Sequence, residues 1–412
     1  MSAPCPHVGR CGGCSHYDVP YPEELQLKET LLREMLGENA RLLEAMHPSP
    51  IVEGYRNKFE LAFGDDGGAS APEGIAAPAG GAPAKGKKTV AERQLALGIR
   101  KKRSMYEVAT TEQCILMPDD FRLIAAYAMQ FFRDAGETVF HRKRHVGALR
   151  HLVLRRGQFT GEILVILSTT STLAADLTPF VQGLRSLPVR GAIVGIGHAV
   201  NDGVADAVKN ENLRMLWGRD FYREKLNGLL FHVSAFSFFQ TNAAGAKVLY
   251  NIVREMATGT APNKLAFDLY CGTGTIAQML SPLFEQVMGI EIVPEAIEAA
   301  RENATLNHIE NCTFHAHDIT KLAAQKKGPL NGAPDAIIVD PPRDGLSPKA
   351  LTKVAALNPR RIIYVACKPA SLMRDLPVLV AAGYKPTRLE AVDLFPRTPH
   401  VEAIALLCRG DT

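Results

Sequence analysis

The chain has 412 residues, 46% of them hydrophobic and 22% charged, with a formal net charge of +4. This length predicts two or three domains, each able to bury a core. No stretch approaches the roughly 20 apolar residues of a membrane span, and the first residues lack the apolar core of a signal peptide, so we expect a cytoplasmic protein with no membrane partner.

Three cysteines stand close together near the N-terminus, at Cys5, Cys11 and Cys14, with two glycines between the last two. Cys114 is the candidate for a fourth thiol. In a cytoplasmic chain, cysteines are more often metal ligands, catalysts or core residues than disulfides. The tight spacing predicts a metal site but leaves zinc and iron–sulfur both open.

The next segment, Asp65–Lys88, consists almost entirely of Gly, Ala, Pro and Asp before its final lysines. Such a composition buries too little apolar surface to offset the entropy of ordering, so we expect a disordered insertion over about residues 65–90. It separates the strand-like runs Lys58–Phe63 and Leu95–Ile99. This pattern indicates a hairpin with a long insertion.

Two dense basic runs follow, Arg100–Arg103 and Arg142–His145, with Arg150, Arg155 and Arg156 shortly after them. Clusters of this kind suit a phosphate backbone. A solvated charged face explains them equally well at this point.

Between residues 146 and 230 we expect a compact α/β domain with strands at Leu152–Leu154, Glu162–Leu167 and Ala192–Gly197 and a helix within Leu173–Leu184. From Leu265 onward, strand-like runs alternate with helix-like stretches such as Pro294–Asn307, which predicts a parallel, doubly wound sheet. The strand-like runs are Leu265–Leu269, Gln286–Ile290, Thr313–Ala316, Ala336–Val339 and Ile362–Val365. The last two runs, Thr387–Leu394 and Glu402–Cys408, have no helix between them and should form an antiparallel pair at the end of the sheet.

Polar motifs follow these strands, at the edge where open α/β sheets bind ligands. The glycine-rich segment Asp268–Thr275 follows the first strand, and the next three strands are followed by Glu291, Asp318 and Asp340. Each acid alone is as well explained as a surface residue or a helix cap. Because the glycines do not form a complete dinucleotide-binding fingerprint, the set suits a nucleoside cofactor without a pyrophosphate, for which S-adenosylmethionine fits better than NAD.

Cys367 follows the fifth strand at the same edge, in the position of a nucleophile facing a cofactor. The neighbouring Lys368 is expected to favour its thiolate, whereas Cys271, Cys312 and Cys408 are expected to be core or turn residues. Glu402 begins the last strand. If that strand is antiparallel to its neighbours, Glu402 faces the same pocket and acts as a proton acceptor.

The chain resembles the RNA uracil-C5 methyltransferases, the group of TrmA, RlmC and RlmD, in five segments that occur in the same order. These segments are Phe238–Asn242, Asp268–Thr275, Asp340–Leu346, Ala366–Pro369 and Pro399–Glu402, with weaker matches at Tyr55–Lys58, Leu149–Leu152 and Leu216–Asp220. Members of the family often have Ser and Asn or Asp on either side of the cysteine, where this chain has Ala366 and Lys368.

The resemblance implies a role for each candidate residue. Cys367 would be the nucleophile that attacks uracil C6, and Glu402 the base that removes the C5 proton. S-adenosylmethionine would be bound by Gln240, Tyr270, Glu291, Asp318 and Asp340, and a [4Fe–4S] cluster by Cys5, Cys11, Cys14 and Cys114.

The same resemblance implies an α/β protein with three parts. A cysteine-rich iron–sulfur segment with a helix would occupy residues 1–50, a smaller central α/β RNA-binding domain residues 51–230, and a class I (Rossmann-like) methyltransferase domain residues 231–412.

Among bacterial members, the cluster cysteines favour 23S ribosomal RNA as the substrate, with uridine 54 of tRNA as the alternative, and we expect a monomer. Two further hypotheses stay open. The first is an amino-methyltransferase, because Asp340-Pro341-Pro342 resembles a motif of enzymes that methylate exocyclic amines. The second is a noncatalytic iron–sulfur RNA-binding protein.

Overall fold

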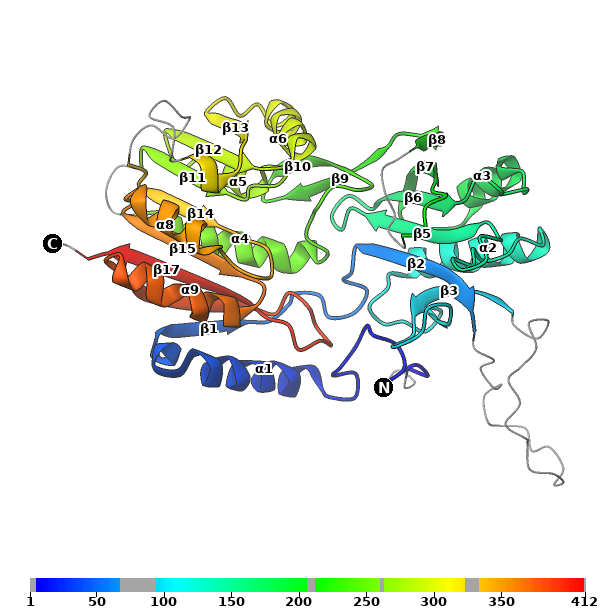
Figure 1. Ribbon diagram of the computed structural model, residues 1–412, viewed down its shortest axis with the longest axis horizontal. Coiled ribbons are helices and arrows are strands. Elements are labelled where there is room, and N and C mark those ends of the chain that lie inside the picture. The colour runs from blue at the N-terminus through cyan, green and yellow to red at the C-terminus, as the bar shows by residue number, and fades with distance from the viewer. Residues whose placement is uncertain (1–4, 67–93, 206–211, 260–262, 323–332, 411–412) are drawn as a thin grey trace, which may run out of the picture. The chain divides into compact units, whose positions relative to one another are not determined.

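The structure is a computed structural model that describes residues 5–66, 94–205, 212–259, 263–322 and 333–410. The chain forms two compact units, coloured in sequence order in Figure 1. Unit 1 consists of residues 1–17, 56–156 and 161–222, and unit 2 of residues 18–55, 157–160 and 223–412. Residues 18–55 therefore belong with the C-terminal part of the chain and not with the cysteine segment. Nearly all of the expected disordered insertion lies outside the described residues.

Unit 1 is built on a sheet that has seven strands within its described residues, in the order β4-β3-β2-β5-β6-β7-β8. The strands are β2 (Lys58–Asp65), β3 (Leu95–Arg100), β4 (Val108–Thr110), β5 (Leu149–Arg156), β6 (Glu162–Thr169), β7 (Ala192–Val200) and β8 (Leu213–Gly218). Strands β2 and β3 pair antiparallel, which confirms the predicted hairpin. The three strands predicted in the central region are also present, each somewhat longer than expected.

Two helices, α2 (Asp119–Asp134) and α3 (Leu177–Ser186), pack beside this sheet. Helix α3 begins four residues later than the pattern indicated. The reason is Asp176, whose side chain caps the helix by accepting a hydrogen bond from the backbone N–H of Thr178 at 2.9 Å. A carboxylate at this position satisfies an otherwise unpaired N–H group of the first turn.

Unit 2 is built on a sheet with eight strands among the described residues, in the order β1-β16-β17-β15-β14-β11-β12-β13. The strands are β1 (Leu43–His47), β11 (Leu265–Leu269), β12 (Gln286–Glu291), β13 (Cys312–Ala316), β14 (Ala336–Val339), β15 (Arg361–Ala366), β16 (Tyr384–Val392) and β17 (Glu402–Arg409). Strands β9 (Phe221–Leu226) and β10 (Leu229–Ser234) form a separate pair.

The five strands from β11 to β15 are parallel, as predicted. Strands β16 and β17 are antiparallel to each other, also as predicted, but their placement at the end of the sheet was wrong. Strand β17 is inserted between β15 and β16, and β1 pairs with β16 to form the edge. This edge comes from a segment more than 300 residues away in sequence, so no local pattern predicts the pairing.

Helices flank the unit 2 sheet, and several begin at prolines, where the missing N–H group costs nothing. They are α1 (Tyr21–Leu36), α4 (Ala243–Ala257), α5 (Thr275–Leu280), α6 (Pro294–Leu306), α7 (Ile319–Leu322), α8 (Pro348–Ala356) and α9 (Pro369–Ala381), with a short 3₁₀ helix at Gly37–Leu42. One apolar core joins the central strands to α1, α8 and α9.

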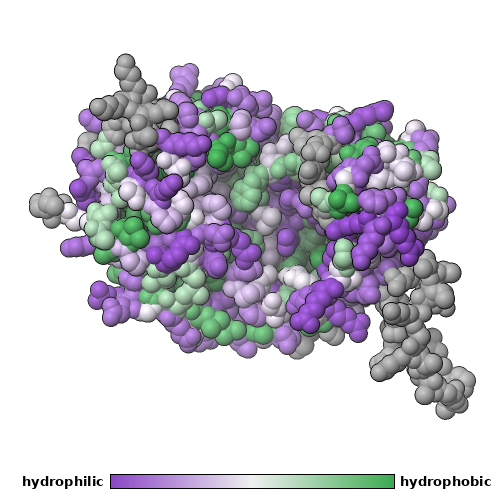
Figure 2. All heavy atoms as spheres, viewed as in Figure 1, coloured by the Kyte–Doolittle hydropathy of each residue, from purple (hydrophilic) through white to green (hydrophobic). Residues whose placement is uncertain are grey.

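Figure 2 shows one face of the molecule, on which hydrophilic residues predominate and apolar residues form small groups. The apolar strip at the lower left lies over α1, where Leu27, Leu31 and Met35 are all substantially exposed. Among the described residues, no helix is long and apolar enough to cross a membrane.

Candidate active site

The glycine-rich turn follows β11 at the carboxyl edge of the unit 2 sheet. Tyr270, Gly272 and Gly274 have positive φ angles of 67°, 52° and 75°. A Cβ atom on Gly274 would lie 2.7 Å from the Phe314 ring and 2.9 Å from the Ala300 Cβ, so this position has no room for a side chain. A positive φ is uncommon for tyrosine and persists where the surrounding structure fixes it, often at functional sites. The turn thus holds Tyr270 in a defined conformation.

Glu291 ends β12 and ties that strand to the glycine turn. Its Oε2 accepts a hydrogen bond from the backbone N–H of Gly272 at 3.3 Å. Its Oε1 accepts from the backbone N–H groups of Ile292 and Val293 at 2.7 and 3.0 Å. These bonds fix the orientation of the carboxylate, which stays partly exposed at the sheet edge.

Asp318 lies beyond β13 and is half-buried. Its Oδ1 accepts hydrogen bonds from the backbone N–H and the hydroxyl of Thr320, at 2.8 and 2.7 Å, at the start of α7. Asp318 is therefore a helix cap, which was the simpler explanation of this residue. The pKa of Tyr270 is raised first by burial and then by the charges of Asp318 and Glu291. Asp318 therefore also lies near the glycine turn.

Two further carboxyl groups belong to this region. Asp340 follows β14, and burial raises its pKa to about 7. Asp268, fully buried on β11, accepts a hydrogen bond from the backbone N–H of Ala277 at 2.9 Å. Its pKa is raised to about 8, first by burial and then by Asp340 and Glu291. Asp268 therefore lies between the groups around the turn and those around Asp340.

Cys367 and Glu402 are brought together by the pairing of β15 with β17. The antiparallel register sets Ala366 opposite Ala403, so the next pair of positions at this edge is Cys367 and Glu402. Directly opposed residues have Cβ atoms only about 4.5–5.5 Å apart. Glu402 is 2% exposed, whereas Cys367 is half-buried. Strand β17 is therefore antiparallel to both neighbours, which is the condition that the sequence analysis set for Glu402 to lie beside Cys367.

The electrostatics of this pair differ from the expectation that Lys368 favours a thiolate. The pKa of Cys367 is raised to about 11, first by burial and then by Glu402 and Asp340. The pKa of Glu402 is raised to about 8, first by burial and then by Asp340. Arg343 is the cation that opposes both shifts. Near neutral pH, Cys367 is therefore a protonated thiol beside the largely protonated carboxyl group of Glu402.

Gln240 precedes α4 and is largely buried. It contacts Tyr250 of α4, a buried residue whose pKa is raised by burial and then by Asp340, Asp268 and Glu402, while a hydrogen bond with Gln240 lowers it. Gln240 and Tyr250 thus belong to the same cluster as Asp340 and Glu402. The predicted site residues of unit 2 are all found along one edge of its sheet.

Three residues of this site were missed by sequence reasoning. Tyr250 lies on an apolar helix and could not be distinguished from a core tyrosine. Arg343 belongs to a motif that was noted, but its electrostatic effect on the pocket depends on the fold. Asp375 of α9 is buried and holds the loop after β14, since its Oδ2 accepts from the Leu346 backbone N–H at 2.8 Å and from the Tyr364 hydroxyl at 2.6 Å.

The N-terminal cysteines all lie in unit 1. Cys5, Cys11, Cys14 and Cys114 line one pocket, together with apolar side chains that include Ile99 and Leu116. The pKa values of the Cys11 and Cys114 thiols are raised, most strongly by burial and further by neighbouring thiols. The pocket thus brings the four predicted thiols near one another, although no three metal-binding side chains among the described residues are arranged around a common point.

Comparisons with known proteins find relatives that cover nearly the whole chain. A profile of the tRNA (uracil-5-)-methyltransferase family matches residues 207–410. An uncharacterized RNA methyltransferase of Clostridium acetobutylicum is 41% identical over 409 residues, which cover 98% of this chain and 83% of that protein. A second, from Caldanaerobacter subterraneus, is 40% identical over 99% of this chain and 85% of its own length.

A solved structure also matches nearly the whole chain. It is the Pyrococcus abyssi tRNA (uracil-54, C5)-methyltransferase in complex with S-adenosyl-L-homocysteine. The two share 27% identity with a TM-score of 0.74, over 99% of this chain and 87% of the other.

Proposed function

Because the chain belongs to the RNA uracil-C5 methyltransferases, which use S-adenosylmethionine, we propose that Cys367 and Glu402 are its nucleophile and base. The observation that carries this proposal is the register of β15 and β17, which ends with Ala366 opposite Ala403 and so leads to Cys367 and Glu402 at the carboxyl edge, together with the effect of Glu402 on the pKa of Cys367. An amino-methyltransferase needs no cysteine nucleophile, so this arrangement counts against that alternative. A noncatalytic RNA-binding protein is excluded by the family.

The proposed reaction begins with the Cys367 sulfur. Uracil C5 is a poor nucleophile, and attack of the thiolate on C6 forms an S–C6 bond and an enolate that is nucleophilic at C5. S-adenosylmethionine supplies an electrophilic methyl group. C5 attacks this methyl carbon, and the bond between the methyl carbon and the sulfonium sulfur breaks. Glu402 then removes the C5 proton, and the electrons of that C–H bond restore the C5–C6 double bond and expel Cys367.

The protonation states set conditions on both steps. Cys367 must lose a proton before it attacks, and Glu402 must be ionised before it accepts one. Because Arg343 lowers the pKa of both groups, it favours the two reactive forms. We propose that Arg343 sets the pH range in which the enzyme works.

We propose that S-adenosylmethionine lies along the glycine turn. Glu291 is oriented by backbone groups and retains acceptor capacity for the ribose hydroxyls. Tyr270, held at a positive φ, would contact the adenosine, Asp318 would lie beside it, and Gln240 and Asp340 would face the methionine end near Cys367. Gln240 and Asp340 both affect the pKa of Tyr250, so they lie near each other, as binding of the same end of the cofactor requires.

We propose that the RNA is bound in part by basic residues of unit 1. The pKa of Arg142 is lowered first by burial and then by the charge of Arg100, which shows that the two basic runs lie near each other. Within these runs, residues such as Lys102 and Arg144 are exposed.

Three arginines near those runs do not belong to this surface. Arg150 is buried and donates to backbone carbonyls, including that of Asn201 at 3.0 Å, and Arg155 is buried over the Tyr222 ring. Arg156 pairs with Asp120 at 3.5 Å.

We propose 23S ribosomal RNA as the substrate, because the cysteine pattern resembles that of the iron–sulfur rRNA enzymes. Uridine 54 of tRNA is the second candidate, favoured by the full-length match to the Pyrococcus enzyme. The two are separated by measuring tritium transfer from methyl-labelled S-adenosylmethionine to 23S rRNA transcripts and to tRNA transcripts, followed by mapping of 5-methyluridine. Methylation of tRNA alone would contradict the rRNA proposal.

We propose that the pocket of unit 1 holds a [4Fe–4S] cluster. Four thiols with an apolar surround fit such a group, and the backbone N–H of Gly13 donates to the Cys11 sulfur at 3.3 Å, as is common around cluster thiolates. The cluster would join the N-terminal segment to β3 and β4 and has no redox task in methyl transfer. Anaerobically purified protein should contain iron and sulfide in equal amounts, and zinc without sulfide would contradict this.

A further inference from the structure

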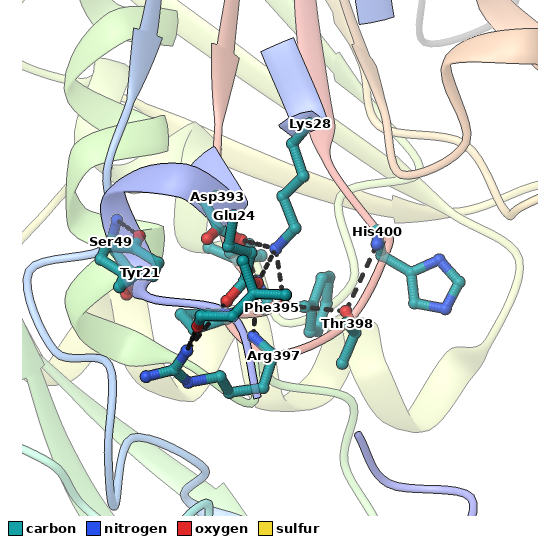
Figure 3. A network of polar contacts seen from close by, with 12 residues as sticks. Tyr21, Glu24, Lys28, Ser49, Asp393, Phe395, Arg397, Thr398 and His400 are labelled. Carbon is teal, nitrogen blue, oxygen red and sulfur yellow. Dashed lines mark hydrogen bonds and ion pairs between the residues drawn. The ribbon is translucent and has the colours of Figure 1, made fainter. Parts of the chain in front are cut away.

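Helix α1 buries two opposite charges against the loop that joins β16 to β17. Lys28 is 1% exposed and Glu24 fully buried. The Lys28 Nζ forms ion pairs with Glu24 at 2.7 Å and with Asp393 at 2.9 Å, and donates a hydrogen bond to the Phe395 carbonyl at 3.2 Å. Figure 3 shows these groups converging, with the amine of Lys28 at the centre.

These charges occupy a stripe of the helix that is otherwise apolar. Glu24, Lys28, Leu32 and Leu36 are the buried residues of α1 and recur every four positions, so they share one face. The C-terminal half of this face consists of the leucines, whereas the N-terminal half, which faces the loop, consists of the two charged residues. Buried ion pairs often stabilise a fold no better than apolar residues would, so their presence points to the fixing of a particular geometry.

The loop beside these charges contains a residue in an unfavourable conformation. Arg397 has a φ of 70°, in the left-handed region that non-glycine residues rarely adopt. Its backbone N–H donates to Glu24 Oε1 at 2.6 Å, and its side chain donates to the Val19 carbonyl at 2.6 Å. A conformation of this kind persists only where the surroundings fix it, and here Glu24 does so.

Other bonds fix the same loop. The Tyr55 hydroxyl donates to the Pro396 carbonyl at 3.1 Å, and the Asn242 side chain donates to the Leu394 carbonyl at 2.9 Å. The loop leads directly into β17, whose first residue is Glu402. The backbone that presents Glu402 is therefore held from α1 by charged groups that themselves take no part in the chemistry.

We propose that Glu24 and Lys28 are positioning residues for Glu402, which keep its carboxyl group beside Cys367 by fixing the preceding loop. This inference rests on the proposed function, in which Glu402 removes the C5 proton. It implies that loss of either charge slows the step that needs Glu402 more than the steps before it. A network that only stabilised the fold would instead affect all steps alike.

The test compares two variants of the network with a matched control on the same helix. Glu24→Gln keeps the shape and removes the charge, and Lys28→Met removes the charge and keeps all but the last atom of the side chain's length. The control is Glu29→Gln, because Glu29 forms an i,i+4 ion pair with Arg33 at 2.7 Å on the exposed face of α1. Each full-length protein is given unmodified RNA and S-adenosylmethionine, and methyl transfer in the first turnover is measured separately from release of the RNA.

We expect Glu24→Gln and Lys28→Met to release product at least tenfold more slowly, since a displacement of about 1 Å at a reacting group has effects of this size. Methyl transfer in the first turnover should change by no more than about threefold. The stalled enzyme should appear as protein–RNA adduct on a denaturing gel. Glu29→Gln should show neither effect.

Glu402→Gln serves as the reference for the release defect. If Glu402→Gln accumulates adduct while folded Glu24→Gln does not, the positioning role is overturned and the proposed function stands. If Glu402→Gln itself turns over normally, Glu402 is not the base, and the inference fails with that assignment. Should Lys28→Met fail to fold, Glu24→Gln alone decides the question, because it keeps the hydrogen-bonding shape of the network.

Discussion

The buried Glu402 carboxyl group predicts an unusual dependence of stability on pH. Its pKa is about 8 in the folded protein, against the ordinary glutamate value of 4.5. Between these values the unfolded chain loses the proton while the folded protein keeps it, so the free energy of unfolding falls as the pH rises from about 4.5 to about 8. Glu402→Gln removes this titration and should be the more stable protein at high pH.

The expected change in the free energy of unfolding follows from the pKa shift of Glu402. Each pH unit within the window is worth about 1.4 kcal/mol, so the variant should gain roughly 3 kcal/mol over the wild type between about pH 5 and about pH 8. Because Asp340 titrates nearby, the two groups are coupled, and we take about 1 kcal/mol as the smallest gain that agrees with the reasoning.

The assay is urea unfolding followed by far-ultraviolet circular dichroism at several pH values, with Glu285→Gln as the control. Glu285 is exposed, so its substitution should leave the pH dependence unchanged. Equal pH dependence of the wild type and Glu402→Gln would refute the description of the pocket as one that disfavours charge.

Two further predictions concern other parts of the site. Arg343→Met should move the rising limb of the pH–rate profile to higher pH, because the cation that lowers the pKa of Cys367 and Glu402 is lost; an unshifted profile would contradict its role. Gly274→Ala should destabilise the protein by about 2–4 kcal/mol and weaken S-adenosylmethionine binding, since it combines a positive φ with a close contact, whereas Gly272→Ala has a positive φ but open space and should cost less. Urea unfolding and calorimetric titration measure both glycine variants, and equal costs would contradict the steric explanation.

Much of the catalytic sheet could be predicted from the sequence. Strands such as β14 are buried on both faces and therefore appear as continuous apolar runs, and each ends in an acid or a glycine turn. The opposition of Cys367 and Glu402 followed from one expectation, that the last strand is antiparallel. That expectation did not depend on which strand forms the edge of the sheet, so the antiparallel pairing is present although β1, and not the pair β16 and β17, forms that edge.

Other features depend on contacts between distant segments. The charged residues Glu24 and Lys28 have the spacing of an exposed helix face, and only the fold shows that they are buried against Asp393. The sequence analysis expected Lys368 to lower the pKa of Cys367, because the two are adjacent in sequence. In the structure Arg343 is the cation that lowers it. Asp318 was correctly placed at a strand end, but its use as a helix cap depends on the turn that follows.

The covalent step is the central claim of the account and is tested most directly with RNA that carries 5-fluorouridine at the target position. Fluorine at C5 cannot leave as a proton does, so the Cys367 adduct should persist after methyl transfer. We predict a denaturation-resistant protein–RNA complex that requires S-adenosylmethionine and is absent from Cys367→Ala. The same yield of complex from the wild type and Cys367→Ala would contradict the assignment of Cys367 as the nucleophile.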